Sequence, residues 1–410
     1  MKIDMALTVR DADVPPWLVV LLAVACGLIV ANIYYAQPLV GPISRDMAIS
    51  PKAAGLIVTM TQVGYGIGLL LVVPLGDVFE NRRLVLIIMA VAALALAGAA
   101  FASHALPFFA AALFIGLGSV AVQVLVPYAA HLSPEAVRGR VVGNVMSGLM
   151  FGIMLARPVA SFITDALSWH AVFIMSALLM VGLGFVLRVA LPRRVPEHEL
   201  GYGALLLSMV GLVRRTPALR RRALYHAFLF AAFSVFWTTA PLLLTDRFHF
   251  SQNGIALFAL AGVAGAVAAP IAGHVADRGW SRPATGLAML AVAAAFLIGR
   301  SGQAGSAWSL AALVIAAITL DFGVTANLVL GQRAIFSLGA EYRSRLNGLY
   351  MATFFVGGAI GSALGGWAYA QGGWPLSSWV GLILPVLALL YSATERSGQD
   401  KGYGRAMTLS

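Results

Sequence analysis

The chain has 410 residues, of which 60% are hydrophobic and only 10% are charged, and its mean hydropathy is +0.89. A soluble protein carries roughly a quarter charged residues, so this composition excludes an ordinary soluble protein. The net charge of +11 does not indicate nucleic-acid binding, because the basic residues form short clusters between apolar runs and do not gather in one tail or on one face.

Apolar runs of about 20 residues recur along the chain, and each can cross a hydrocarbon core of roughly 30 Å as a helix. The first six predicted helices are Trp17–Gln37, Ala53–Leu75, Leu84–Ser103, Pro107–Leu132, Val141–Thr164 and Ala171–Leu191. The other six are Ala223–Leu244, Gly254–Ala276, Ala284–Arg300, Ser306–Gln332, Leu346–Ala370 and Pro375–Ser392. The ten-residue segments of alternating polarity that a membrane β-barrel would show are absent. The sequence therefore predicts an all-α polytopic membrane protein with twelve transmembrane helices in two six-helix bundles.

The longest polar section lies between the two sets of helices. We expect a first bundle over residues 1–195, a linker over 196–222, a second bundle over 223–395 and a tail over 396–410. In the linker, leucines and valines before Arg214 and Arg215 predict a helix, which lies either along the inner membrane surface or beneath the bundle as a connecting helix. We see no cleavable signal peptide, and the single cysteine, Cys26, leaves no intrachain disulfide possible.

Basic residues are distributed unevenly between the two sets of loops. Loops on one side hold nearly all the arginines, whereas the other side holds only Arg45, Lys52, Arg247 and Arg300. Because cytoplasmic loops carry the excess of basic residues, the sequence predicts that both termini face the cytoplasm.

Two motifs recur about half the chain length apart. The polar loop Pro74–Arg83 between the second and third predicted helices has a counterpart, Gly273–Arg282, between the eighth and ninth. Arg138-Gly139-Arg140 precedes the fifth helix, as Arg343-Ser344-Arg345 precedes the eleventh, and both helices then carry small residues at every fourth position. The recurrence indicates a duplicated bundle, and the small residues predict closely packed helices.

These features together resemble the major facilitator superfamily of secondary transporters over nearly the whole chain. The family's first loop motif is roughly G-x-x-x-D-[RK]-x-G-x-[RK]-[RK]. Here Asp77, Arg82 and Arg83 match the motif, whereas Val73, Val78 and Glu80 depart from it; the second copy keeps Gly273, Asp277, Arg278 and Arg282. The stretch Asn32–Pro38 and the pair Arg157-Pro158 are similar to the branch that exports drugs, sugars or nucleosides from bacteria.

The resemblance implies a proton-driven antiporter that exports a small molecule by alternating access, as a monomer in the bacterial inner membrane. It also implies a cytoplasmic gate in which Asp77 faces the start of the eleventh helix, near Leu346. The gate candidates are Asp77, Arg82, Arg83, Arg138, Arg140, Asp277, Arg278, Arg343 and Arg345. An uptake permease or facilitator, and a transporter-like sensor that moves no substrate, remain alternatives, and the loop arginines could serve topology alone.

Other functional classes find little support in the sequence. None of the lysines, Lys2, Lys52 and Lys401, sits in a G-x-x-x-x-G-K-[ST] motif, which argues against an ATP-driven pump. The run Glu197-His198-Glu199 is not H-E-x-x-H, and no His/Cys cluster has metal-ligand spacing. We therefore expect no enzyme, no cofactor, no metal and no nucleic-acid partner.

Two charged residues lie deep within predicted helices, Arg157 in the fifth and Asp321 in the tenth. A charge at that depth costs several kcal/mol unless it is paired or wetted, so it suggests function. Asp321 is the only deep carboxylate and is therefore the proton-coupling candidate. Arg157 would bind an anionic or hydroxyl-rich substrate, or stabilise a carboxylate. A structural role for either residue is the alternative, and the sequence does not tell whether the two meet.

Polar and aromatic residues within the helices suggest a central substrate cavity for a neutral or amphipathic solute. The candidates are Asn32, Tyr35, Gln37, Gln62, Tyr65, Gln123, Arg157, His226, Trp237 and Asn327. For any one of them, an interhelical hydrogen bond explains an intramembrane amide equally well. Tyr34 and Tyr35 could instead belong to the aromatic belt at the membrane surface.

Overall fold

The computed structural model describes residues 15–196, 201–303, 305–339 and 342–395. The predicted tail over 396–410 and the run Glu197-His198-Glu199 in the linker lie outside the described residues.

The first half of the chain is helical throughout its apolar runs. Its elements are α1 (Pro16–Ala31), α2 (Val40–Asp46), η1 (Pro51–Ala53), α3 (Leu56–Leu71), η2 (Val73–Asp77), α4 (Asn81–Ala100), α5 (Ala105–Ser119), α6 (Ala121–Leu132), α7 (Glu135–Ala166) and α8 (Trp169–Ala190). The helix α9 (Tyr202–Arg215) then connects the two halves.

The second half repeats this plan. Its elements are α10 (Pro217–Phe248), α11 (Gln252–Ala259), η3 (Leu260–Val267), α12 (Ala268–Asp277), α13 (Ser281–Ile298), α14 (Ala307–Phe336) and α15 (Arg343–Ala393). The last of these contains two helices, since Gly372 and Gly373 have non-helical backbone angles.

The described residues account for all twelve predicted membrane helices. Ten helical stretches are long and apolar enough to cross a membrane, and α1 is a shorter apolar helix. Division of α15 at Gly372 and Gly373 gives the twelfth. The predicted all-α membrane fold is therefore confirmed.

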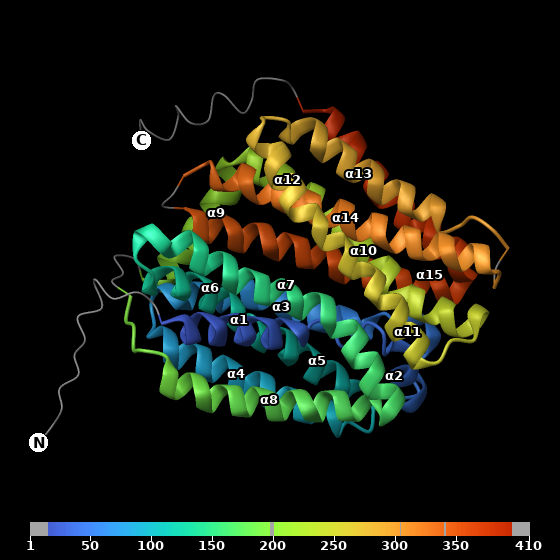
Figure 1. Ribbon diagram of the computed structural model, residues 1–410, viewed down its shortest axis with the longest axis horizontal. Helices are drawn as coiled ribbons and strands as arrows, with labels where there is room; N and C mark the ends of the chain where they lie inside the picture. The colour runs from blue at the N-terminus through green and yellow to red at the C-terminus, as the bar shows by residue number, and fades with distance from the viewer. Residues whose placement is uncertain (1–14, 197–200, 304, 340–341, 396–410) are drawn as a thin grey trace, which may run out of the picture.

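The two halves lie side by side with their helices running between two common ends (Figure 1). The helices α1–α8 form one group and α10–α15 the other. The end that carries α9, the start of α10 and the end of α15 is called the linker end, and the end that carries α2 is called the α2 end.

Glycines at matching places hold each half together. In the first half, added Cβ atoms on Gly148 and Gly152 of α7 would overlap the backbone of α1; in the second, those on Gly357 and Gly361 of α15 would overlap the backbone of α10. The predicted close approach at these small residues is confirmed.

The first predicted helix ends six residues early, and here the sequence-based boundary was wrong. The helix α1 ends at Ala31, and a buried, non-helical segment follows it to Leu39. Pro38 has no N–H to donate and disfavours helical geometry at Gln37, so it limits how far a helix could continue, but it lies seven residues beyond the observed end at Ala31. Non-helical backbone at membrane depth is tolerated where it is buried in protein or lines a cavity.

The linker helix α9 packs beneath the second half. Its Met209 and Leu212 belong to one hydrophobic cluster with Leu346 and Leu349 of α15, while Leu207 on its other face is exposed. The sequence left open whether this helix lies along the membrane surface or packs beneath the bundle as a connecting helix. These contacts are those of a packed connecting helix.

The halves contact each other most extensively along α3 and α15. At the α2 end this contact continues through η1 with α15, α2 with α10 and α11 with α7. Towards the linker end, α12 packs mainly on α14 and α13, and Figure 1 shows it diverging from α7.

Candidate functional site

The two deep charges meet at the interface between the halves. Nη1 of Arg157, on α7, lies 3.7 Å from Oδ2 of Asp321, on α14, and this contact is called the central ion pair. Arg157 is only 4% exposed and Asp321 only 7%. Since α7 and α14 belong to different halves, the central ion pair joins them electrostatically.

Each charge also has a hydrogen-bond partner from its own half. Nε of Arg157 donates to Oε1 of Gln37 at 2.9 Å, and Nε1 of Trp237 donates to Oδ1 of Asp321 at 2.8 Å. If the halves separate, each charge can therefore keep one strong hydrogen bond while the ion pair between the halves is lost.

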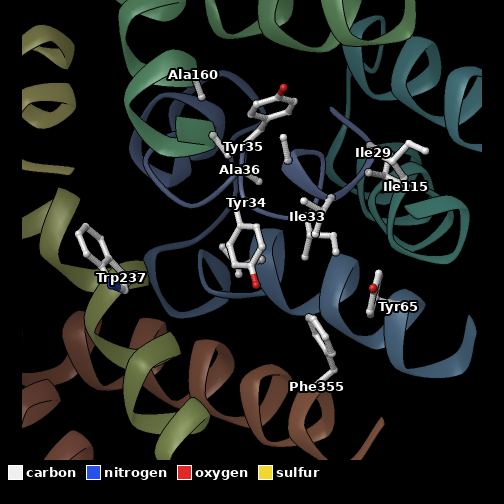
Figure 2. Packing of buried hydrophobic residues seen from close by; sticks show 14 of the residues in the cluster. Ile29, Ile33, Tyr34, Tyr35, Ala36, Tyr65, Ile115, Ala160, Trp237 and Phe355 are labelled. Atoms are coloured by element: carbon white, nitrogen blue, oxygen red, sulfur yellow. The ribbon is translucent and has the colours of Figure 1, made fainter. Parts of the chain in front are cut away.

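Aromatic rings surround the guanidinium of Arg157. Its Cζ lies 4.0 Å from the ring centroid of Trp237, 5.0 Å from that of Phe233 and 5.8 Å from that of Tyr34. Figure 2 shows Tyr34 pointing into the region between Trp237 and Phe355, while its neighbour Tyr35 points to the opposite side, near Ala160. Ring faces attract a cation, so these residues compensate part of the cost of burying Arg157.

The short 3₁₀ segment η3 approaches the central ion pair through two glycines. A Cβ atom on Gly262 would lie 2.5 Å from Oδ2 of Asp321 and 3.1 Å from Nη1 of Arg157. A Cβ atom on Gly265 would lie 2.5 Å from Cβ of Asp321. Both positions therefore need glycine, because any side chain would displace the carboxylate.

Two further groups of candidates lie along the interface between α3 and the second half. Nε2 of Gln62 donates to Oγ of Ser234 on α10 at 3.1 Å. Gln123 donates to the hydroxyl of Tyr65 at 3.0 Å, and the Tyr65 ring lies 4.3 Å from that of Phe355 on α15. These contacts extend the interface from the central ion pair as a mixture of amide, hydroxyl and aromatic groups.

Other candidates make recorded contacts that do not include the central ion pair. Asn32 accepts a hydrogen bond from Ser176 within the first half, and His226 bonds Asn327 at 2.9 Å within the second. Tyr35 lines a groove between α1, α7 and α8.

Several buried polar atoms have no hydrogen-bond partner among the described residues. They include Nε2 of Gln37, Oε1 of Gln62, Oγ1 of Thr238 and Nδ2 of Asn32. A buried polar group without a partner is costly. Gln37 places such a free donor on a residue that already touches Arg157, where a ligand with an acceptor group would satisfy it.

The gate candidates fall into separate local contacts at the linker end. Asp77 lines a small cavity together with Arg345 and Gly348 at the start of α15, and Arg345 donates to Oγ of Ser208 on α9 at 2.9 Å. Burial lowers the pKa of the Arg194 guanidinium, and the nearby Asp77 carboxylate opposes that shift.

The remaining basic candidates bond within their own half. Arg82 donates to the carbonyl oxygen of Leu191 at 3.1 Å, Arg138 to that of Ala130 at 3.0 Å and Arg343 to that of Phe336 at 3.2 Å. Asp277 pairs with Arg333 in the second half. At this end Asp77 of the first half and Arg345 of the second therefore lie beside the same cavity, and among the described residues no hydrogen bond or ion pair is recorded for the side chains of Arg83, Arg140 and Arg278.

One departure from the family's loop motif has a local structural role. Glu80 is the N-cap of α4, and its carboxylate accepts the backbone N–H groups of Arg82 at 3.0 Å and Arg83 at 3.2 Å. A glycine could not make these bonds.

Sequence reasoning missed four residues beside the central ion pair: Tyr34, Phe233, Gly262 and Gly265. The spacing of the two glycines in an otherwise apolar helix was a usable signal, since small residues mark close approach in membranes. No such signal showed which of Tyr34 and Tyr35 lies beside Arg157, because the backbone of this segment is not helical.

The arrangement combines a titratable carboxyl group, a buried cation, amides and aromatic rings at the interface between the halves. Asp321 can gain and lose a proton at the interface between the halves, and Arg157 presents a fixed positive charge beside it. The unpaired amide groups and the aromatic faces offer polar and apolar contacts to a small molecule.

The sequence profile of the Major Facilitator Superfamily matches residues 20–339. The chain is 38% identical over 385 residues to an uncharacterized transporter, YgaY, of Escherichia coli, which covers 94% of this chain and 97% of the relative. It is 35% identical over 361 residues to a protein of Streptomyces coelicolor that is named as a transporter, covering 86% and 82% of the two chains. A solved D-xylose-proton symporter has the same fold, with a TM-score of 0.72 and 17% identity, covering 92% and 97% of the two chains.

Proposed function

Since this chain belongs to the Major Facilitator Superfamily, we propose that it is a proton-coupled transporter that exports a small organic solute by alternating access. The central ion pair carries the proposal. In transporters built from two repeats the substrate binds near the midplane between them, and the central ion pair crosses that interface while almost fully buried.

The central ion pair acts as a lock on the closed α2 end. Two unit charges 3.7 Å apart attract each other by about 4.5 kcal/mol at an effective dielectric constant of about 20. Removing one partner of a buried pair costs about 3–5 kcal/mol, because the other charge stays buried and unpaired. An empty transporter with an ionised Asp321 therefore stays closed at this end.

A proton and the solute each open the lock. Protonation of Asp321 removes its charge, so only the rings of Trp237 and Phe233 still attract Arg157 to the opposite half. A solute opens the lock when it offers an acceptor to Arg157 and a donor to Asp321, since both charges then keep partners. Because proton and solute compete for Asp321, the two cross in separate halves of the cycle, which is the requirement for antiport.

The chemistry of the site favours a net-neutral solute with an apolar, flat part. Its donor and acceptor would lie next to each other, close enough to enter between Arg157 and Asp321. The free Nε2 of Gln37 would donate to the same acceptor, and the rings of Trp237 and Phe233 would pack against the apolar part.

The arginine distribution supports the orientation and therefore the direction. Loops at the linker end carry most of the arginines, so we place this end and both termini in the cytoplasm of a bacterium. Protons then enter from the α2 end down their gradient, and the solute leaves in exchange. The protein would carry out this cycle as a monomer.

The test is solute-driven proton movement in proteoliposomes that contain a pH-sensitive dye, screened over neutral drugs, sugars and nucleosides. Wild type should release protons when an accepted solute is added, and Asp321→Asn should not. Asp277→Asn is the matched control, because this carboxylate is exposed and pairs with Arg333 within one half. If Asp321→Asn moves protons like wild type, or if no solute moves protons in any protein, the proposal fails.

A further inference from the structure

A long groove runs along the outside of the first half, away from the interface between the halves. It has a volume of about 1160 Å³ and is lined by α1, α7 and α8. Side chains such as Val24, Phe151, Leu155 and Leu179 line it and are exposed. In a membrane-spanning protein, such a groove faces the hydrocarbon chains of the bilayer.

One face of α7 gives the groove a polar end and an apolar remainder. Arg140, Asn144 and Ser147 follow each other at helical spacing from the linker end, and Phe151 and Leu155 continue the same exposed stripe. Arg140 and Phe151 are eleven residues apart, which corresponds to about 16 Å along an α-helix. One leaflet of a hydrocarbon core is about 15 Å thick, so the stripe changes from charged to apolar over the length of one leaflet.

Arg140 differs from the other arginines of the two repeated motifs. Arg138, Arg343 and Arg345 each donate a hydrogen bond to another part of the protein. Within the part of the chain that the structure describes, no hydrogen bond or ion pair is recorded for Arg140, and it lines the groove instead. Its charge is therefore available to an anion at the mouth of the groove.

We propose that this groove binds one anionic phospholipid from the leaflet at the linker end. The phosphate pairs with Arg140, the ester groups lie at Asn144 and Ser147, and an acyl chain follows Phe151 and Leu155. A water-soluble anion would leave the apolar part uncovered, whereas a phospholipid matches both parts of the groove.

The experiment is native mass spectrometry of the purified, full-length protein after incubation with phosphatidylglycerol or phosphatidylcholine. Wild type should retain one phosphatidylglycerol, and Arg140→Gln should retain it five- to tenfold less, as expected for loss of one phosphate contact. Arg138→Gln is the matched control and should behave like wild type, since Arg138 bonds Ala130. Asn144→Trp, which fills the polar end, should lose the same lipid while folding normally by circular dichroism.

Three outcomes would overturn the proposal. One is equal retention of phosphatidylglycerol by wild type, Arg140→Gln and Asn144→Trp. Another is equal retention of phosphatidylcholine and phosphatidylglycerol by wild type, which would mean unspecific boundary lipid. The last is a several-fold gain in lipid retention after deletion of residues 2–14, which would mean that the N-terminal segment occupies the groove. None of these outcomes depends on transport activity.

Discussion

Replacing Asp321 by asparagine should open the α2 end of the protein. Asparagine has nearly the same shape and can still accept the hydrogen bond from Trp237, so the substitution removes little except the charge. Arg157 then stays buried without its ionic partner in the closed conformation, whereas water reaches it in the open one. The substitution therefore penalises the closed conformation selectively.

The distance in the central ion pair sets the size of the effect. At 3.7 Å, the lost attraction is about 4.5 kcal/mol at an effective dielectric constant of about 20, within the roughly 3–5 kcal/mol typical of a broken buried pair. Each 1.4 kcal/mol is about a tenfold change in an equilibrium constant. The ratio of open to closed protein should therefore rise by about two to three orders of magnitude.

Distance measurements between spin labels can detect this shift. Labels at Leu167 and Leu257 would sit on exposed sites of the first and second half at the α2 end. A Cys26→Ala background removes the single native cysteine, which is buried. Wild type at alkaline pH should give one short distance, and Asp321→Asn should give a longer one. As pH falls, protonation of Asp321 removes the ion pair, so wild type should shift to the longer distance while Asp321→Asn does not respond.

A double variant separates charge from packing. Arg157→Gln combined with Asp321→Asn leaves two neutral amides and no unpaired buried charge, so the short distance should return. If Asp321→Asn keeps the wild-type distance, or if the double variant stays as open as the single one, the central ion pair is not the lock.

Three further substitutions test other contacts. Gly262→Ala should lower solute-driven proton flux at least tenfold, because its Cβ would push the central ion pair apart; flux like that of wild type would contradict this. Gly366→Ala places a Cβ 2.5 Å from the backbone N of Gly55, so spin labels at the α2 end should report an opening, and an unchanged distance would refute this. Glu395→Gln leaves Arg222 buried without the carboxylate that lies 3.7 Å from it. Thermal unfolding should then show that the free energy of unfolding falls by about 1–3 kcal/mol, and an unchanged melting curve would contradict this expectation.

The fold was predictable because it follows from local patterns. Apolar runs of membrane-spanning length and small residues spaced four apart are visible in the sequence, and each reflects contact with lipid or with an adjacent helix. The error at the end of α1 has a clear cause. Apolar residues continue past Ala31 through Ile33–Ala36, and composition does not show where α-helical hydrogen bonds give way to the three-residue turns seen here, such as Tyr34 to Ala31.

The central ion pair was predictable only in part. Burial cost identified Arg157 and Asp321 as unusual, since charged residues at that depth need partners. The two residues are 164 positions apart in the sequence, and their pairing depends on how the two bundles dock, which no local pattern encodes. The sequence analysis named Tyr35 as the cavity candidate, whereas Tyr34 lies beside Arg157; neighbouring residues in a non-helical segment follow no helical period that would distinguish them.

The η3 segment gives the helix that contains it a means to change length. A 3₁₀-helix rises about 2.0 Å per residue with three residues per turn, against about 1.5 Å and 3.6 residues for an α-helix. If the eight residues of η3 adopted α-helical geometry, this stretch would shorten by about 4 Å, and α12 would rotate by roughly 160° relative to α11. Such a screw motion would carry Gly262 and Gly265 away from Asp321 and leave space beside the carboxylate. The helix would stay intact during this transition. Each backbone N–H would only change its acceptor from the carbonyl three residues earlier to the one four residues earlier.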